Sequence, residues 1–195
     1  MVLLSGILTL SYPFLVYFGL EVLQARHIAL IALGLLAIRA FTFRDYIREQ
    51  LAHTWPIVAI MVFFFGLSAI LNDELYILFL PALVHFALLL YFASTFFRPP
   101  VIIERFARAH LGEPFPKLAE LYCRWVTGAW CLFFATNASI SLYTVYSGDK
   151  WLWTIYNGLI SWIALAAFVG IEYACRCLID PRVKREQAKL SPRSE

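Results

Sequence analysis

The sequence carries little charge. Charged residues make up 15% of its 195 residues, whereas hydrophobic residues make up 62%, and the mean hydropathy is +0.73. A soluble domain is typically about 45–50% apolar and about 25% charged. A single soluble core could not bury this much apolar surface, so we expect lipid to surround most of the chain. The length suits one compact membrane domain and leaves no room for a separate soluble domain.

Motifs for common catalytic and ligand-binding chemistries are missing. The sequence contains no P-loop, GxGxxG, GxSxG or HExxH motif and no acidic metal cluster. The paired broken spans of an inverted-repeat transporter are absent as well. The four cysteines form no CxxC pair and lie on expected spans or their ends, which argues against a disulfide framework and against a metal site: Cys123, Cys131, Cys175 and Cys177. We therefore expect no cofactor, no metal and no nucleic-acid partner, and a non-enzymatic protein is favoured over an enzyme.

Continuous apolar runs predict an all-α, polytopic membrane domain over residues 1–179, a bundle of about six transmembrane helices. About 20 helical residues cross the hydrocarbon, and backbone in lipid must satisfy its own hydrogen bonds. The first run lacks the basic region and the cleavage site of a signal peptide, so it is expected to be a retained span. The expected spans are residues 3–20, 27–43, 54–71, 76–97, 123–146 and 151–179.

Basic residues mark one side of the membrane. All of the 16 Lys and Arg residues except Arg26 and Lys150 lie in or beside the connections after the second, fourth and sixth spans. Because such residues concentrate on the cytoplasmic side, these connections are expected inside, with both termini cytoplasmic. A chain of five spans would place the N-terminus outside and leave the other loops unchanged. Residues 180–195 are expected to be a disordered, basic cytoplasmic tail.

Tryptophans support these span boundaries. Four of them fall near predicted interfaces, where amphipathic rings settle: Trp55, Trp125, Trp151 and Trp153. Trp130 and Trp162 lie deeper and are expected to pack between helices.

The longest connection follows the fourth span. Pro99-Pro100 ends that span, and residues 101–111 predict a short helix that lies in the cytoplasmic interface. One face of it is expected to hold Ile102, Ile103, Phe106, Ala109 and His110. The other face and the flanking arginines are a candidate surface for anionic lipid or a cytoplasmic partner, with a solvated face as the simpler alternative: Arg98, Glu104, Arg105, Arg108 and Arg124.

Polar residues within the spans are candidates for an intramembrane polar pocket, because such residues are costly in lipid. They are Arg39, His85, Asn137, Asn157 and Glu172. Each also has a simpler structural reading. Arg39 can bind an anionic headgroup, pair with Glu172, or snorkel to the interface. Glu172 can instead pair with Arg176 one turn later.

The other three candidates sit deeper in the expected spans. His85 is either a proton relay or base, or a neutral histidine bonded to a neighbouring helix. Asn137 is expected to join helices through hydrogen bonds. Asn157, beside Gly158, either lines a pocket on the outer side or serves helix packing.

Several short motifs give the chain a resemblance to a known family. They are Tyr12-Pro13-Phe14, Phe65-Gly66-Leu67, Asn72-Asp73-Glu74, the segment from Arg98 to Arg108, Glu113-Pro-Phe-Pro116, and Ala129-Trp130 with Phe133-Phe134. In this order they resemble the bacterial intracellular septation protein A family of small inner-membrane proteins. A longer linker and the Tyr156-Asn157-Gly158 sequence are similar instead to an uncharacterised branch encoded near aryl-polyene pigment genes. The resemblance supplies no catalytic residues.

The resemblance implies a role in cell-envelope maintenance or septation, or an accessory role in aryl-polyene lipid biosynthesis. The leading hypothesis is a non-enzymatic, multi-pass protein of the bacterial inner membrane. Its expected partners are membrane lipids, other envelope or division membrane proteins, and a second copy of itself. The alternatives are a lipid-handling enzyme and a small transporter, each with an intramembrane polar pocket.

Overall fold

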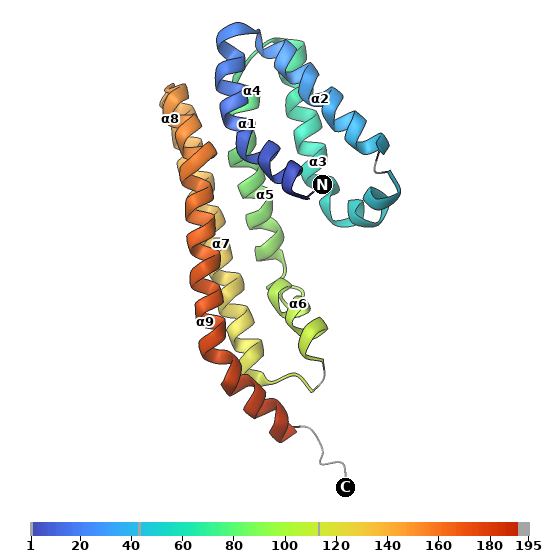
Figure 1. Cartoon of the computed structure of the whole chain (residues 1–195), viewed down its shortest axis with the longest axis vertical. Helices are drawn as coiled ribbons and strands as arrows, with labels where there is room; N and C mark the ends of the chain where they lie inside the picture. The colour runs from blue at the N-terminus through green and yellow to red at the C-terminus, as the bar shows by residue number, and fades with distance from the viewer. Residues whose placement is uncertain (1, 43, 113, 191–195) are drawn as a thin grey trace. The chain divides into compact units, whose positions relative to one another are not determined.

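The computed structural model describes the backbone of residues 2–42, 44–112 and 114–190, with the side chains of residues 11–38, 41, 58–112 and 114–190. All regular secondary structure in these ranges is helical, as the all-α prediction requires. The elements are α1 (Val2–Val22), α2 (Ala25–Thr42), α3 (Arg44–Leu71), α4 (Leu75–Leu78), α5 (Leu80–Ser94), α6 (Ile102–Leu111), α7 (Lys117–Tyr146), α8 (Lys150–Ile155), the π-helix η1 (Tyr156–Ile160) and α9 (Ser161–Leu190) (Figure 1).

Each expected span coincides with a helix or a run of helices, although the boundaries differ. Helix α3 begins at Arg44 rather than at Thr54, and α7 begins at Lys117 rather than at Cys123. Two stretches of the described residues are long and apolar enough to cross a membrane, Leu75–Ser94 and Lys150–Leu190. Shorter apolar helices cover Ala25–Ile38 and Val58–Leu71. A crossing by all six predicted spans therefore remains a prediction.

Large apolar side chains cover much of the surface of these helices. Ile38 is 65% exposed, Ile70 is 74% exposed and Leu132 is 70% exposed. A soluble monomer rarely exposes so much apolar surface in contiguous patches. This surface suits contact with lipid.

The chain divides into two compact units. The first comprises residues 1–87 and 137–162, and the second comprises residues 88–136 and 163–195. In the first unit α1 contacts α2, α8 and η1, and α3 contacts α2 and α4. Its buried core includes Val16, Phe65 and Ile77.

Trp153, which the sequence predicts near a membrane interface, belongs to this core. The side chain is 1% exposed, and its indole Nε1 donates a hydrogen bond to the carbonyl oxygen of Leu78 at 2.9 Å. A buried indole needs such an acceptor, and α4 provides one. By contrast Trp125 and Trp151 are 73% and 52% exposed, and the side chain of Trp55 lies outside the described residues.

The second unit is organised around aromatic rings. Trp130 of α7 lies 4.7 Å from Phe168 of α9, 5.4 Å from Phe134 and 6.0 Å from Phe92 of α5, measured between ring centroids. Phe133 also packs on Phe168, at 5.0 Å. Offset and edge-on contacts at these separations are favourable. The Trp-x-x-Phe-Phe motif therefore joins three helices, as the deep position of Trp130 predicted.

The expected disorder of the C-terminal tail is wrong for residues 180–190, which continue α9 to Leu190. Val183 is 5% exposed, the Gln187 side chain donates to the carbonyl oxygen of Leu111 at 2.9 Å, and the Glu186 carboxylate accepts from the Leu118 N–H at 3.2 Å. One turn of α9 thus ties the end of α6 to the start of α7. The remaining tail residues, 191–195, lie outside the described residues.

Replacing Glu186 with alanine is expected to loosen the start of α7. The Leu118 N–H would lose its side-chain acceptor, and loss of such a cap costs about 1 kcal/mol. Hydrogen exchange should accelerate at the Leu118 amide, about fivefold for that energy. Glu186→Gln keeps an acceptor oxygen and should exchange nearly as slowly as the wild type, and Lys189→Ala on the exposed side of α9 should be neutral. Equal exchange in all four proteins would contradict the cap.

Candidate functional site

Two of the polar residues predicted to share a pocket lie in one buried cluster of the first unit. The Asn137 Oδ1 accepts hydrogen bonds from the Tyr156 hydroxyl at 3.1 Å and from the Ser161 hydroxyl at 3.0 Å. The Asn157 Oδ1 accepts from the Ser141 hydroxyl at 2.8 Å. We call these five residues the α7–η1 polar cluster. Each of them is less than 9% exposed.

The π-helical turn η1 places these side chains. Its backbone closes with a hydrogen bond from the Ser161 N–H to the Tyr156 carbonyl oxygen, five residues apart. Such a turn inserts one extra residue into an α-helix and is frequently found at functional sites. The Asn157 Nδ2 donates to the Trp153 carbonyl oxygen at 2.9 Å, which fixes the amide orientation.

Gly158 allows η1 to approach α1. A Cβ atom at this position would lie 2.7 Å from Cε2 of Phe14. The separation is too short for any side chain without movement of the ring. The sequence suggested packing through this small residue as one of two roles for Asn157-Gly158, and the geometry shows such packing.

The α7–η1 polar cluster is closed by hydrogen bonds. Within the part of the chain that the structure describes, every buried side-chain nitrogen or oxygen has a partner. In a low-dielectric interior, a satisfied network rigidifies its surroundings. Asn137 and Asn157 therefore join α7 to the α8–η1–α9 run, as the hydrogen-bonding prediction for Asn137 anticipated.

Replacing Asn137 with leucine is expected to destabilise the protein by about 2 kcal/mol, since two interhelical hydrogen bonds of about 0.6–1.7 kcal/mol each are lost. The Tyr156 and Ser161 hydroxyls would be left buried without this acceptor. Denaturation by sodium dodecyl sulfate, followed by circular dichroism, measures the free energy of unfolding. Thr136→Leu, at the exposed neighbouring position, is the matched control and should be neutral. Equal stability of the two variants would refute the structural role of the network.

The remaining pocket candidates are His85, Glu172 and Arg39. His85 is half-buried on α5, and its Nδ1 donates to the carbonyl oxygen of Pro81 in the same helix at 2.8 Å. Glu172 belongs to the second unit, and the side chain of Arg39 lies outside the described residues. Asn137 and Asn157 thus lie in one cluster, and a pocket shared by all five residues stays a prediction.

Glu172 forms a local ion pair. Arg176 contacts it through two bonds, Nε to Oε1 at 3.0 Å and Nη2 to Oε2 at 2.6 Å. The Tyr122 hydroxyl of α7 reaches the same carboxylate at 3.4 Å. This arrangement matches the alternative in which Glu172 pairs one turn along its own helix, and it also links α9 to α7.

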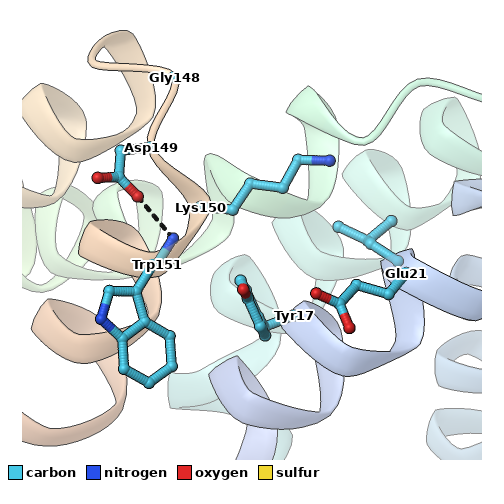
Figure 2. A pocket seen from close by; sticks show the side chains of 7 residues that line it. Tyr17, Glu21, Gly148, Asp149, Lys150 and Trp151 are labelled. Carbon is cyan, nitrogen blue, oxygen red and sulfur yellow. Dashed lines mark hydrogen bonds between the residues drawn. The ribbon is translucent and has the colours of Figure 1, made fainter.

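A shallow polar hollow of about 280 Å³ lies where α1 meets the start of α8 (Figure 2). Sequence patterns do not predict this hollow, because its lining comes from segments that are distant along the chain. The Asp149 carboxylate caps α8 by accepting from the Trp151 N–H at 2.9 Å, and Lys150 points away to pair with Glu74 at 2.7 Å. Trp151 packs edge-on against Tyr17, with centroids 5.6 Å apart. Asp149 and Lys150 of this hollow therefore stabilise the fold.

Helix α6 occupies most of the predicted interfacial segment, but its faces differ from the prediction. Glu104 is 4% exposed, because Arg108 holds its carboxylate at 2.7 Å, whereas Phe106 is 63% exposed. Arg108 also covers the Phe115 ring, at 4.3 Å from its centroid. Glu104 and Arg108 thus anchor α6, and Glu104 does not lie on the proposed contact surface.

The other three arginines of that surface remain exposed around the turn at residues 96–100. Arg105 donates from Nε to the Pro100 carbonyl oxygen at 2.8 Å and from Nη2 to the Arg98 carbonyl oxygen at 3.1 Å. The Arg124 guanidinium lies 5.9 Å from the centroid of the Phe96 ring. We call Arg98, Arg105 and Arg124 the arginine triad.

Comparison with known proteins gives one informative likeness. The chain is 24% identical over 144 residues to the inner membrane-spanning protein YciB of Magnetococcus marinus, an alignment covering 74% of the chain and 70% of that protein. No protein-family model matches the chain, and no solved structure matches it. The likeness confirms the resemblance to intracellular septation protein A-like inner-membrane proteins and supports a place in the bacterial inner membrane.

Proposed function

We propose, from the resemblance to septation protein A-like inner-membrane proteins, that this chain is a non-enzymatic, multi-pass membrane protein that serves envelope maintenance or septation. It crosses the membrane six times with both termini in the cytoplasm. It acts by holding membrane or envelope proteins through its apolar helix surfaces and its cytoplasmic basic surface. An accessory role in aryl-polyene lipid synthesis is a variant of the same proposal.

The proposal rests on the hydrogen bonds that the polar residues of the expected spans form within the protein. Asn137 and Asn157 bind each other's helices through Ser141, Tyr156 and Ser161, at distances of 2.8–3.1 Å. Glu172 is engaged by Arg176 and Tyr122. Because these side chains already form bonds within and between helices, they favour a scaffold. The alternatives, a lipid-handling enzyme and a small transporter, each need a polar pocket.

Cysteine labelling tests the six-span orientation. In a variant without native cysteines, Gly148→Cys should react with an impermeant maleimide added outside intact spheroplasts, since residue 148 follows α7 on the expected outer side. Lys189→Cys should react only after permeabilisation. Labelling of residue 189 from outside would overturn the orientation.

Deletion of the gene in its own host tests the role. The proposal expects longer cells with fewer septa or a leakier envelope, both restored by the wild-type chain. Loss of extractable polyene lipid alone would select the accessory role. If the deletion strain divided normally, kept an intact envelope barrier and made normal polyene lipid, the roles in septation, envelope maintenance and lipid synthesis would all be contradicted. Asn137→Ala with Asn157→Ala separates the pocket alternatives, because a folded variant that complements fully excludes a functional polar pocket.

A further inference from the structure

We infer that the arginine triad, Arg98, Arg105 and Arg124, binds the phosphodiester headgroup of an anionic phospholipid at the cytoplasmic face. The inference deepens the proposed function and rests on its orientation of the chain. All three residues belong to the second unit and surround the same turn at residues 96–100.

The triad differs from several other cations of its unit in its contacts. Three other cations of the same unit have carboxylate partners: Arg108 pairs with Glu104, Arg176 with Glu172 and Lys184 with Asp180. Among the described residues, the triad has no ion pair; its contacts are two backbone carbonyl oxygens and one aromatic ring. The turn therefore gathers three positive charges that form no ion pair with an acidic side chain of the described residues.

The guanidinium groups also keep hydrogen-bonding capacity. A guanidinium has five N–H donors. The two bonds of Arg105 to Pro100 and Arg98 hold its plane against the backbone and leave three donors over. Such a fixed, planar group suits phosphate oxygens better than a flexible ammonium does.

Exposed aromatic rings flank the triad. Phe97 is 87% exposed, Phe106 is 63% exposed and Trp125 is 73% exposed. Cations interleaved with exposed aromatic rings are typical of a surface that lies at the headgroup level of a bilayer. The rings reach the acyl boundary while the guanidinium groups meet phosphate, so a lipid fits this surface better than a soluble anion does.

Native mass spectrometry of the purified full-length protein tests the inference. The protein is given phosphatidylglycerol and phosphatidylcholine in equal amounts. Wild type should retain the anionic lipid preferentially, and the variant Arg98→Gln/Arg105→Gln/Arg124→Gln should lose about tenfold or more of that preference, since each cation contributes about fivefold near an anionic surface.

A matched variant controls for charge. Arg182→Gln/Arg185→Gln/Lys189→Gln removes three exposed cations of α9 and should keep the wild-type preference. The double variant Arg98→Gln/Arg124→Gln leaves the backbone bonds of Arg105 intact, so its loss of preference cannot come from misfolding of the turn. Equal loss in the α9 control, or no preference in wild type, would overturn the inference.

Two competitors identify the anion. Inorganic phosphate should not displace phosphatidylglycerol, and displacement would assign the triad to free phosphate instead of lipid. The second competitor is a polyglutamate peptide. If this peptide bound through the triad and the wild type showed no lipid preference, the triad would be a site for an acidic protein segment and the lipid site would be refuted. Failure of the orientation is seen separately, by labelling of residue 189 from outside, and does not change the lipid preference in vitro.

Discussion

Replacing Trp130 with alanine is expected to destabilise the protein by about 2–3 kcal/mol, below the usual value for a buried tryptophan because lipid replaces water as the solvent. The indole contacts Phe92, Phe134 and Phe168, so its removal leaves a gap where α5, α7 and α9 meet. A gap too small to be refilled loses the dispersion contacts of every ring around it. Denaturation by sodium dodecyl sulfate measures the change.

Two variants calibrate this result. Trp130→Phe keeps one ring in the cluster and should recover more than half of the lost stability. Leu132→Ala truncates a side chain on the same helix that is 70% exposed. That side chain contacts lipid before and after unfolding in the membrane, so its loss should be nearly neutral. If Leu132→Ala destabilised as much as Trp130→Ala, the aromatic cluster would not be the core of the second unit.

Replacing Gly158 with valine is expected to destabilise the protein by about 2–3 kcal/mol, the usual cost of forcing extra atoms into a packed contact. The first added carbon alone would lie 2.7 Å from the Phe14 ring. The ring of α1 must then move away from η1, and contacts around Val16 and Trp153 are lost with it. Thermal unfolding in detergent, read by size-exclusion chromatography, reports the change.

A second substitution isolates the cause. Phe14→Ala creates space beside η1, so Gly158→Val should cost less in the Phe14→Ala background than in the wild type. Gly170→Val is the matched control, because a Cβ at Gly170 meets no atom within 4 Å. Additive effects of the Phe14 and Gly158 substitutions would show that their contact does not limit this position.

The aromatic motif illustrates how far the sequence reaches. Trp130 could be assigned to a helix–helix contact because a tryptophan far from both ends of an apolar run has no interface to occupy. Its partners could not be assigned. In a span surrounded by lipid, the buried and exposed faces are both apolar, so hydropathy carries little signal for which face meets which helix.

The C-terminal tail and α6 show the corresponding difficulty for polar residues, whose burial is hard to predict from the sequence. Their polar composition predicted disorder for residues 180–195, and it predicted that Glu104 lies on a lipid or partner contact surface or on a solvated face. In the structure Glu186 and Gln187 serve backbone groups of α7 and α6, and Arg108 neutralises Glu104. A polar residue can be buried when a partner accepts or donates its hydrogen bonds. Here the partner lies too far along the chain, or on too ambiguous a helix face, to be predicted from the neighbouring sequence.

The sequence by itself determined the helical class and the approximate positions of the apolar helices, because backbone desolvation acts on each segment separately. It also predicted the cytoplasmic side from the basic residues. The tertiary structure alone decided that Asn137 binds Tyr156 and Ser161, that a π-turn seats Gly158 on Phe14, and that three arginines share one turn. Those outcomes depend on which helices meet and at what rotation, and packing sets both.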